Sequence, residues 1–188
     1  MDAAEHLFAT RGYRTTTMEA IAREAGFSRG SLYRQFPTRD ELVSALVRRV
    51  TQRHTTRILD RLPADADLLS ILVESMVMVA TELIHDPLLK TISDQTDDRT
   101  VAFMLANNPA LHEIVQASIE AMMGQEDRGG LRSDLHPKDV ATFLIGTNIS
   151  MLLGVIPGVD NAQTARRYID VFILPALMAD PPPAGEVF

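Results

Sequence analysis

The chain has 188 residues, enough for one large domain or two small ones, and its 46% hydrophobic and 23% charged residues exclude a disordered chain. It has no cysteine, which excludes disulfides, a thiolate nucleophile and cysteine zinc sites. The net charge of −7 divides unevenly: residues 1–57 carry ten arginines and six acids, a net +4, and the remaining residues a net −11. Such asymmetry indicates an N-terminal end that meets phosphates, with chance unevenness as the alternative.

Apolar residues return at helical spacing along the whole chain, and no strand-like alternation is sustained. The first expected helix covers residues 2–10 and ends at Gly12. A second helix is expected to be capped by Thr16, with Glu19 completing a capping box, and to be stopped by Gly26. Its apolar face comprises Met18, Ile21, Ala22 and Ala25.

A third short helix follows at once. Ser28 is a good N-cap for it, and Leu32 and Phe36 fall on its buried side. Thr38 and Glu41 form another capping box, which opens a long fourth helix to about Leu62. The second and third helices therefore form a helix-turn-helix, in which the N-terminal residues of the second member meet base edges in the DNA major groove.

The same stretch resembles the N-terminal domain of the TetR family of transcriptional regulators over about the first fifty residues. The residues that carry the resemblance are Thr16-Thr17, Ala25-Gly26, Ser28-Arg29-Gly30, Leu32-Tyr33, Phe36 and Arg39. The resemblance implies a homodimer that binds a near-palindromic operator in double-stranded DNA, usually as a repressor released by a small molecule. Unlike the family pattern, the chain begins within the first helix, without a basic arm ahead of it.

Arg29, Ser31 and Arg34 are the expected base readers, because arginine can bond O6 and N7 of guanine together and serine can meet several base edges. Gly30 lets the backbone approach the DNA closely. By resemblance, Thr17, Tyr33 and Arg39 are expected to bind phosphates. The full predicted DNA-binding set is Thr16, Thr17, Ser28, Arg29, Gly30, Ser31, Tyr33, Arg34 and Arg39.

Alternatives remain for three of these residues. Tyr33 could simply pack on Arg29 or Pro37. Arg34 could touch phosphate alone, since phosphate contacts outnumber base contacts. Thr16 fits a structural cap better than a DNA contact.

The second part of the chain matches the family only in length and helical pattern. Helices are expected over 67–85, over a broken segment 87–108, and over 109–125, 137–156 and 161–178. The expected architecture is therefore all-α: a DNA-binding domain over residues 1–46, a helical effector-binding and dimerisation domain over 47–180, and a mobile proline-rich tail over 181–188. The long fourth helix links the two domains.

Gly146, Ser150 and Gly154 repeat at four-residue spacing, which lets another helix approach closely. Because the family dimerises through its last two long helices, we expect these residues to form the subunit interface with Tyr168, Phe172 and Leu177. Close packing within the same chain is an equal alternative. An effector cavity is expected to be lined by Phe103, Met104, Gln116, Asn148 and Met151, although methionine-rich segments are more often ordinary core.

No catalytic motif is present in the sequence, and the five histidines are scattered singly, so we expect neither an enzyme nor a cofactor or metal site. Asp94, Asp97 and Asp98 fit a solvated kink better than a metal site. The uncharged run over 140–156 is short for a membrane span, and residues 1–20 do not resemble a signal peptide, so a cytoplasmic protein is expected. The leading prediction is a ligand-released repressor with a mostly apolar effector. The alternative is a DNA-binding regulator without a small-molecule effector.

Overall fold

The computed structural model describes residues 1–86, 102, 105–125 and 130–181. Every regular element in these ranges is helical apart from one isolated bridge between Leu131 and Met178, so the predicted all-α class is confirmed. The chain divides into two compact units: Met1–Thr51 with His85–Leu111, and Gln52–Ile84 with His112–Phe188. The division at residue 51 falls inside the long fourth helix, whereas the sequence predicted a boundary at residue 46.

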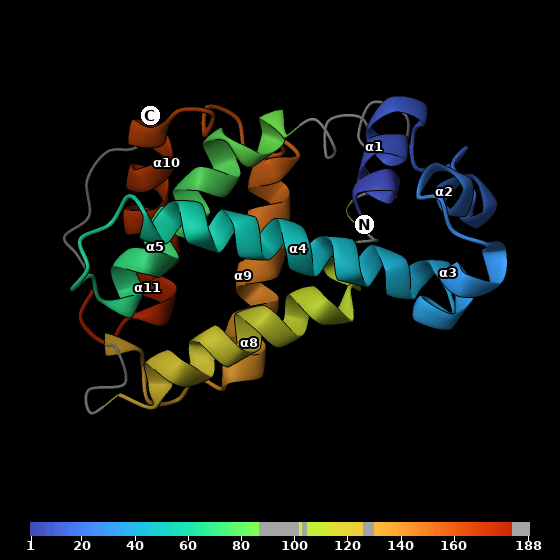
Figure 1. The fold of residues 1–188 in the computed structure, drawn as a ribbon. Helices are drawn as coiled ribbons and strands as arrows, with labels where there is room; N and C mark the ends of the chain where they lie inside the picture. The colour runs from blue at the N-terminus through green and yellow to red at the C-terminus, as the bar shows by residue number, and fades with distance from the viewer. Residues whose placement is uncertain (87–101, 103–104, 126–129, 182–188) are drawn as a thin grey trace. The chain divides into compact units, whose positions relative to one another are not determined.

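The first unit opens with four helices (Figure 1): α1 (Asp2–Arg11), α2 (Met18–Glu24), α3 (Arg29–Gln35) and the N-terminal half of α4 (Arg39–Leu59). Each contributes apolar side chains to one small core, and Phe8, Leu7 and Leu42 are its largest fully buried members. Leu42 and Leu46 lie on the inward face of α4 and are buried. Its C-terminus lies at Leu59, one turn before the predicted end at Leu62.

The helix starts differ from the prediction in one place. Thr17 caps α2, its hydroxyl accepting a 3.2 Å hydrogen bond from the Ala20 N–H, whereas Thr16 was expected there. Ser28 caps α3 as predicted, accepting 3.1 Å from the Ser31 N–H. Gly26, between the two helices, has φ +71°, a left-handed conformation that glycine adopts without Cβ strain.

The second unit contains the C-terminal half of α4, then α5 (Leu68–Thr81) with the short 3₁₀ turn η1 (Leu83–His85) at the unit boundary, then α8 (Pro109–Met123), α9 (Pro137–Leu152), α10 (Ala162–Tyr168), η3 (Ile169–Ile173) and α11 (Leu174–Leu177). Asp67 caps α5 through a 2.7 Å bond from the Ser70 N–H. Apolar side chains of α5, α8, α9 and the last three elements form a shared core, with Met76, Ile119 and Ile169 completely buried at its centre.

The last helical stretch was predicted as one helix over 161–178, and it is helical throughout, but its middle is widened. Residues Ile169–Ile173 form a π-helical segment immediately before Pro175. Proline has no N–H and its ring clashes with the preceding turn of an α-helix, so a locally wider turn accommodates it. At the end of α11, the Arg132 N–H donates to the Leu177 carbonyl and the Ala179 N–H to the Gly130 carbonyl, both at 2.9 Å.

Helix α9 is shorter than predicted. It ends at Leu152, not near Ile156, because Gly154 takes a left-handed φ of +64°. Gly154 therefore belongs to the turn that ends the helix. Within the described part of the chain, no helix has both the length and the apolar content that crossing a bilayer requires.

Candidate nucleic-acid interface

The first turn of α3 presents its side chains to solvent. Ser28, Arg29 and Gly30 are exposed, Ser31 is half-buried, and Leu32 beneath them is 5% exposed and anchors the helix in the core. Ser28 and Ser31 also join through their hydroxyls at 2.9 Å. Together with the hydrogen bond from the Ser31 N–H to the Ser28 hydroxyl, this contact fixes the N-terminal turn of α3. The exposed side chains are therefore held on a rigid turn, as recognition of base edges requires.

Arg29 is held from two sides. Its Nε lies 3.1 Å from a carboxylate oxygen of Glu19 on α2, and its guanidinium lies 5.3 Å from the centroid of the Tyr33 ring. The Arg29 side chain is still 69% exposed. An exposed pair of this kind contributes little to stability. It does leave the two terminal nitrogens of Arg29 available for the paired contact to guanine that the sequence predicts.

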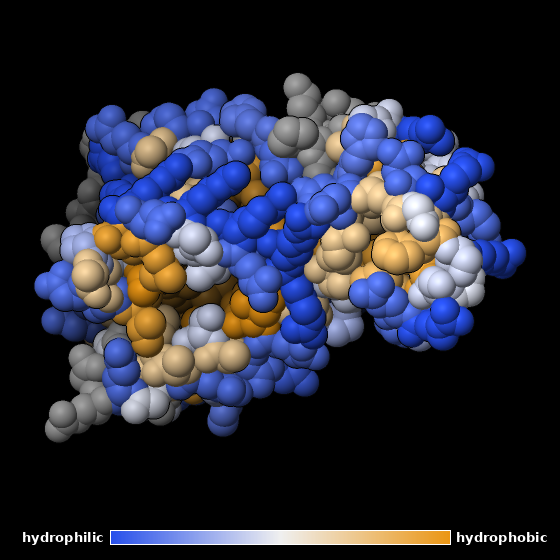
Figure 2. Space-filling view, viewed as in Figure 1, coloured by the Kyte–Doolittle hydropathy of each residue, from blue (hydrophilic) through white to orange (hydrophobic). Residues whose placement is uncertain are grey.

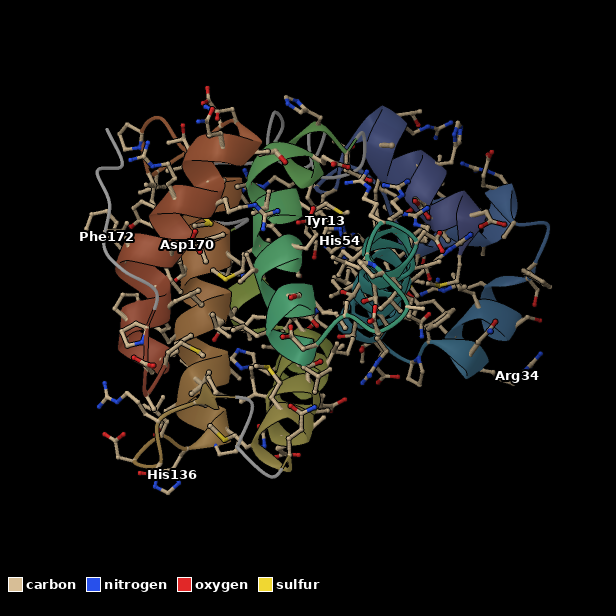
Figure 3. All side chains as sticks on the ribbon, turned by 90° about the vertical axis from the view of Figure 1, so that its left-hand side faces the viewer. Tyr13, Arg34, His54, His136, Asp170 and Phe172 are labelled. Atoms are coloured by element: carbon tan, nitrogen blue, oxygen red, sulfur yellow. The ribbon has the colours of Figure 1, made fainter. Side chains whose placement is uncertain are left out.

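Arg34 lies on the same helix, four residues from Gly30, and is exposed at the edge of the unit (Figure 3). Its Nη2 donates a 3.0 Å hydrogen bond to the Ser31 hydroxyl. The three predicted base readers, Arg29, Ser31 and Arg34, are thus brought together on one exposed surface. Whether Arg34 reaches a base or a phosphate stays a prediction.

Gly30 has no structural reason to be glycine. A Cβ built at this position meets only the Ser28 hydroxyl oxygen, at 4.0 Å, and its φ is not left-handed. The missing side chain therefore leaves the outer face of α3 open, which agrees with the prediction that the backbone approaches a ligand there. Thr17, exposed at the N-cap of α2, keeps its hydroxyl proton available for a phosphate.

Two predicted DNA contacts need correction. Thr16 is 1% exposed, and its hydroxyl donates inward to the carbonyls of Gly12 (2.8 Å) and Leu7 (3.2 Å). A side chain buried in this way cannot reach a phosphate, and it is not the cap of α2 either. Thr16 joins the C-terminus of α1 to the start of α2.

The second correction concerns Arg39. Its guanidinium donates to the carbonyls of Thr16 (2.6 Å) and Tyr13 and lies 4.3 Å from the centroid of the Tyr13 ring. Only a phosphate contact was predicted for Arg39 from the sequence, and these internal hydrogen bonds were not predicted. We therefore assign Arg39 to holding the unit together. The signal that sequence reasoning missed was Tyr13, an aromatic side chain in the loop just before Thr16.

The predicted effector-binding residues do not gather into one set. Phe103 and Met104 lie outside the described residues. Gln116 donates 2.8 Å to Glu120 on the surface of its own helix, which gives it a partner there. Met151 is 2% exposed and belongs to the core of the second unit. Asn148 is different: its amide nitrogen donates a 2.9 Å hydrogen bond to the Leu144 carbonyl, and its buried Oδ1 has no hydrogen-bond partner within the described ranges.

A second buried polar atom without a partner in the described part of the chain is the Nε2 of His54, a residue that sequence reasoning did not select. His54 is 8% exposed, on the half of α4 that belongs to the second unit, and its imidazole bonds to the backbone of Ser75 on α5. Figure 3 shows it between these two helices. Burial lowers its pKa from the ordinary value, because a charged imidazole loses hydration there. A single histidine among arginines and threonines gives no sequence signal of burial.

The predicted interface stripe, Gly146, Ser150 and Gly154, lies only partly on an exposed face of α9. A Cβ built at Gly146 meets nothing within 4 Å, so among the described residues no other helix packs there. Phe143 shares this face and is 41% exposed. Leu177, however, is buried in the core, and Gly154 lies beyond the end of α9.

Tyr168 and Phe172 contact each other with ring centroids 5.1 Å apart, and Phe172 is 53% exposed. Figure 3 shows Phe172 at the outer edge of the second unit. The described residues contain no group of three histidine, aspartate or glutamate side chains that could hold a metal ion. Asp94, Asp97 and Asp98 lie outside those residues.

Comparison with known proteins identifies the N-terminal region. The model of the family described as bacterial regulatory proteins, tetR family, matches residues 1–46. The uncharacterized HTH-type transcriptional regulator Rv1255c of Mycobacterium tuberculosis is 41% identical over 76 residues, which cover 38% of this chain and 38% of that protein. The HTH-type transcriptional regulator UidR of Escherichia coli is 22% identical over 170 residues, covering 89% of this chain and 83% of UidR.

The whole fold has relatives among solved structures. A structure of a SmeT–triclosan complex covers 98% of this chain and 94% of its own, with a TM-score of 0.52 and 24% identity. Both sequence relatives are described as HTH-type transcriptional regulators. The helix-turn-helix on α2 and α3 lies within residues 1–46, which match the tetR family of bacterial regulatory proteins, and the chain as a whole shares the all-helical fold of the SmeT structure.

Proposed function

We propose that this protein is a transcriptional repressor that binds a palindromic operator as a homodimer and releases it when a small, mostly apolar effector binds its second unit. The observation that carries the DNA-binding part is the exposed first turn of α3, fixed by Ser28 and carrying Arg29 and Ser31. A rigid helix end with an arginine and a hydroxyl on its outer face suits direct readout in the major groove.

The homodimer is supported by exposed apolar and small residues on the last helices. Phe143 and Gly146 share one exposed face of α9, and Phe172 is exposed on η3. Large exposed aromatic side chains mark association surfaces more often than ordinary surface. A two-fold dimer would present two copies of α3 to the two halves of a palindrome.

The effector is supported by the surface of the second unit. Figure 2 shows a hollow with apolar side chains on its floor between the C-terminal half of α4 and helix α8. Sites for small molecules are typically concave and mostly apolar, with a few placed polar groups. SmeT, which shares the fold, was solved in complex with triclosan.

Coupling would run through α4, because this helix begins in the first unit and ends in the second. An effector that favours one position of its C-terminal half would alter the spacing of the two recognition helices. Half-sites lie one helical repeat apart, so a changed spacing breaks contacts at both halves.

Fluorescence anisotropy with labelled duplexes from the DNA upstream of the protein's own gene tests the proposal. We expect preferential binding to a palindromic duplex at modest ionic strength, and release when apolar compounds are added. Failure to prefer any duplex would contradict DNA recognition. Preference without release by any compound would favour the alternative, a regulator without a small-molecule effector.

A further inference from the structure

Two side chains of the second unit each end in a buried hydrogen-bonding atom that has no partner among the residues that the structure describes. They are the Nε2 of His54 on α4 and the Oδ1 of Asn148 on α9. Such atoms are rare in native proteins, because an unsatisfied buried atom loses the hydrogen bonds that water supplies to it in the unfolded chain. Both belong to helices of the proposed effector unit.

The neighbours of each side chain decide which kind of hydrogen bond it can make. The His54 imidazole forms a hydrogen bond with the backbone of Ser75 on α5. The imidazole nitrogen without a partner among the described residues is Nε2. A neutral imidazole that donates to a carbonyl through Nδ1 has a lone pair, and no proton, on Nε2. The free nitrogen of His54 is therefore an acceptor.

Asn148 leads to the same result by a different route. Its amide nitrogen donates to the Leu144 carbonyl one turn earlier, which fixes the amide orientation. The remaining atom, Oδ1, can only accept. Both unpartnered atoms are thus acceptors, and neither can satisfy a carboxylate, an ether oxygen or another group that only accepts.

We propose that the effector is an uncharged, mostly apolar molecule that carries hydroxyl or N–H groups and donates hydrogen bonds to His54 and Asn148. This inference rests on the proposed function and specifies the chemistry of its effector. His54 lies three residues beyond Thr51, where α4 passes from the first unit into the second. A donor that bonds to His54 therefore acts on the helix that the two units share.

The chemistry also predicts what the site rejects. A molecule of the same apolar shape that lacks a donor leaves both acceptors unsatisfied, and sites built around such groups discriminate strongly against analogues without them. A carboxylate would place a negative group against two acceptors. Donor content, more than apolar volume, should therefore rank the ligands.

Isothermal titration of the full chain with 4-hexylphenol, 4-hexylanisole and 4-hexylbenzoate tests this ranking, because the three share an apolar body and differ in the terminal group. We expect the phenol to bind at least tenfold more tightly than the anisole or the benzoate. His54→Leu should reduce the affinity for the phenol about tenfold and leave that for the anisole unchanged. His54→Gln, which retains an acceptor, should preserve part of the preference.

His136→Leu is the matched control, because His136 is exposed at the start of α9 and far from His54 in Figure 3. Asn148→Leu gives an independent second variant should His54→Leu not fold. Equal affinities for phenol and anisole, no binding by any of the three, or an unchanged phenol affinity in both leucine variants would overturn the proposal. DNA anisotropy without compounds reports separately on the proposed repressor function, so the two failures are distinguishable.

Discussion

The guanidinium of Arg39 donates a 2.6 Å hydrogen bond to the backbone carbonyl of Thr16, joining the first residue of α4 to the segment just before α2. The same guanidinium bonds to the Tyr13 carbonyl and lies over the Tyr13 ring. Since Thr17 begins α2 and α2 carries the turn into α3, one arginine holds the helix-turn-helix against α4.

The main effect of Arg39→Ala should therefore be a loss of folding stability, and not the loss of a direct contact with DNA. Two hydrogen bonds from a charged donor are lost, each worth about 1.5–3 kcal/mol, and the Thr16 and Tyr13 carbonyls lose a partner. Urea unfolding measures the change. Arg14→Ala is the control, because Arg14 is exposed in the same unit. Unchanged stability, together with a salt slope of DNA binding reduced by about one unit, would restore the phosphate role.

The sequence predicted the N-terminal unit well because its signals are local. Ser28 as a cap and Gly26 as a left-handed stop depend only on neighbouring backbone, and both are confirmed. The roles of Thr16 and Arg39 depend on bonds to residues 4 to 26 positions away, which no local pattern encodes. Their hydroxyl and guanidinium fit both a surface contact and an internal bond.

The second unit was less predictable for the same reason. Helix positions followed from periodicity, but burial of a polar residue depends on which helices pack over it. Gln116 and Asn148 look alike in sequence, yet one bonds to Glu120 on its own helix and the other has a buried oxygen without a partner. The predicted stripe at residues 146, 150 and 154 assumed that α9 continues through Gly154. The helix ends at Leu152, because Gly154 takes a left-handed conformation.

Gly30→Ala should separate DNA approach from folding. A Cβ at this helical position meets only the Ser28 hydroxyl oxygen, at 4.0 Å, and alanine favours helix over glycine by up to about 1 kcal/mol. We expect equal or higher stability in urea unfolding and weaker operator binding in anisotropy, because the methyl group stands where the DNA would approach. Gly26→Ala provides contrast, since its φ of +71° should make that change destabilising. If Gly30→Ala binds the operator as tightly as the wild type does, the DNA does not approach α3 closely at residue 30.

Arg29→Ala should relax base preference. If the terminal nitrogens of Arg29 bind one guanine, their loss costs about 1–3 kcal/mol on the preferred operator and much less on a duplex with that base pair changed. Anisotropy titrations of both duplexes at one salt concentration give the two losses. Replacing the guanine with 7-deazaguanine should weaken the wild type and leave Arg29→Ala unaffected. Equal losses on both duplexes would assign Arg29 to a phosphate.

Phe172→Glu and Phe143→Glu should disrupt the homodimer. Both aromatic side chains are exposed, and placing a carboxylate in a buried interface leaves a charge without hydration. Sedimentation velocity at micromolar concentration should show monomers for these variants and dimers for the wild type. Leu59→Glu, at a 51% exposed leucine on α4, controls for an added surface charge. If the wild type also sediments as a monomer, the proposed homodimer interface is contradicted.

His54 should make stability depend on pH in a defined window. Its pKa is lowered in the folded protein mainly by burial, assisted by Arg57 and Arg61 and opposed by the Ser75 bond and Glu82. Below its ordinary value of 6.5, the unfolded chain binds a proton that the folded protein does not, so stability falls as the pH decreases through that value. The slope can reach about 1.4 kcal/mol per pH unit, and it ends once the pH falls below the lowered folded pKa.

Urea unfolding between pH 5 and 7.5 should show this slope in the wild type and a flatter one in His54→Leu. Glu82, which forms an ion pair with Arg61, and Asp67, which caps α5, also have lowered pKa values, and both act only at more acidic pH. An identical slope in both proteins would mean that His54 is hydrated in the folded state.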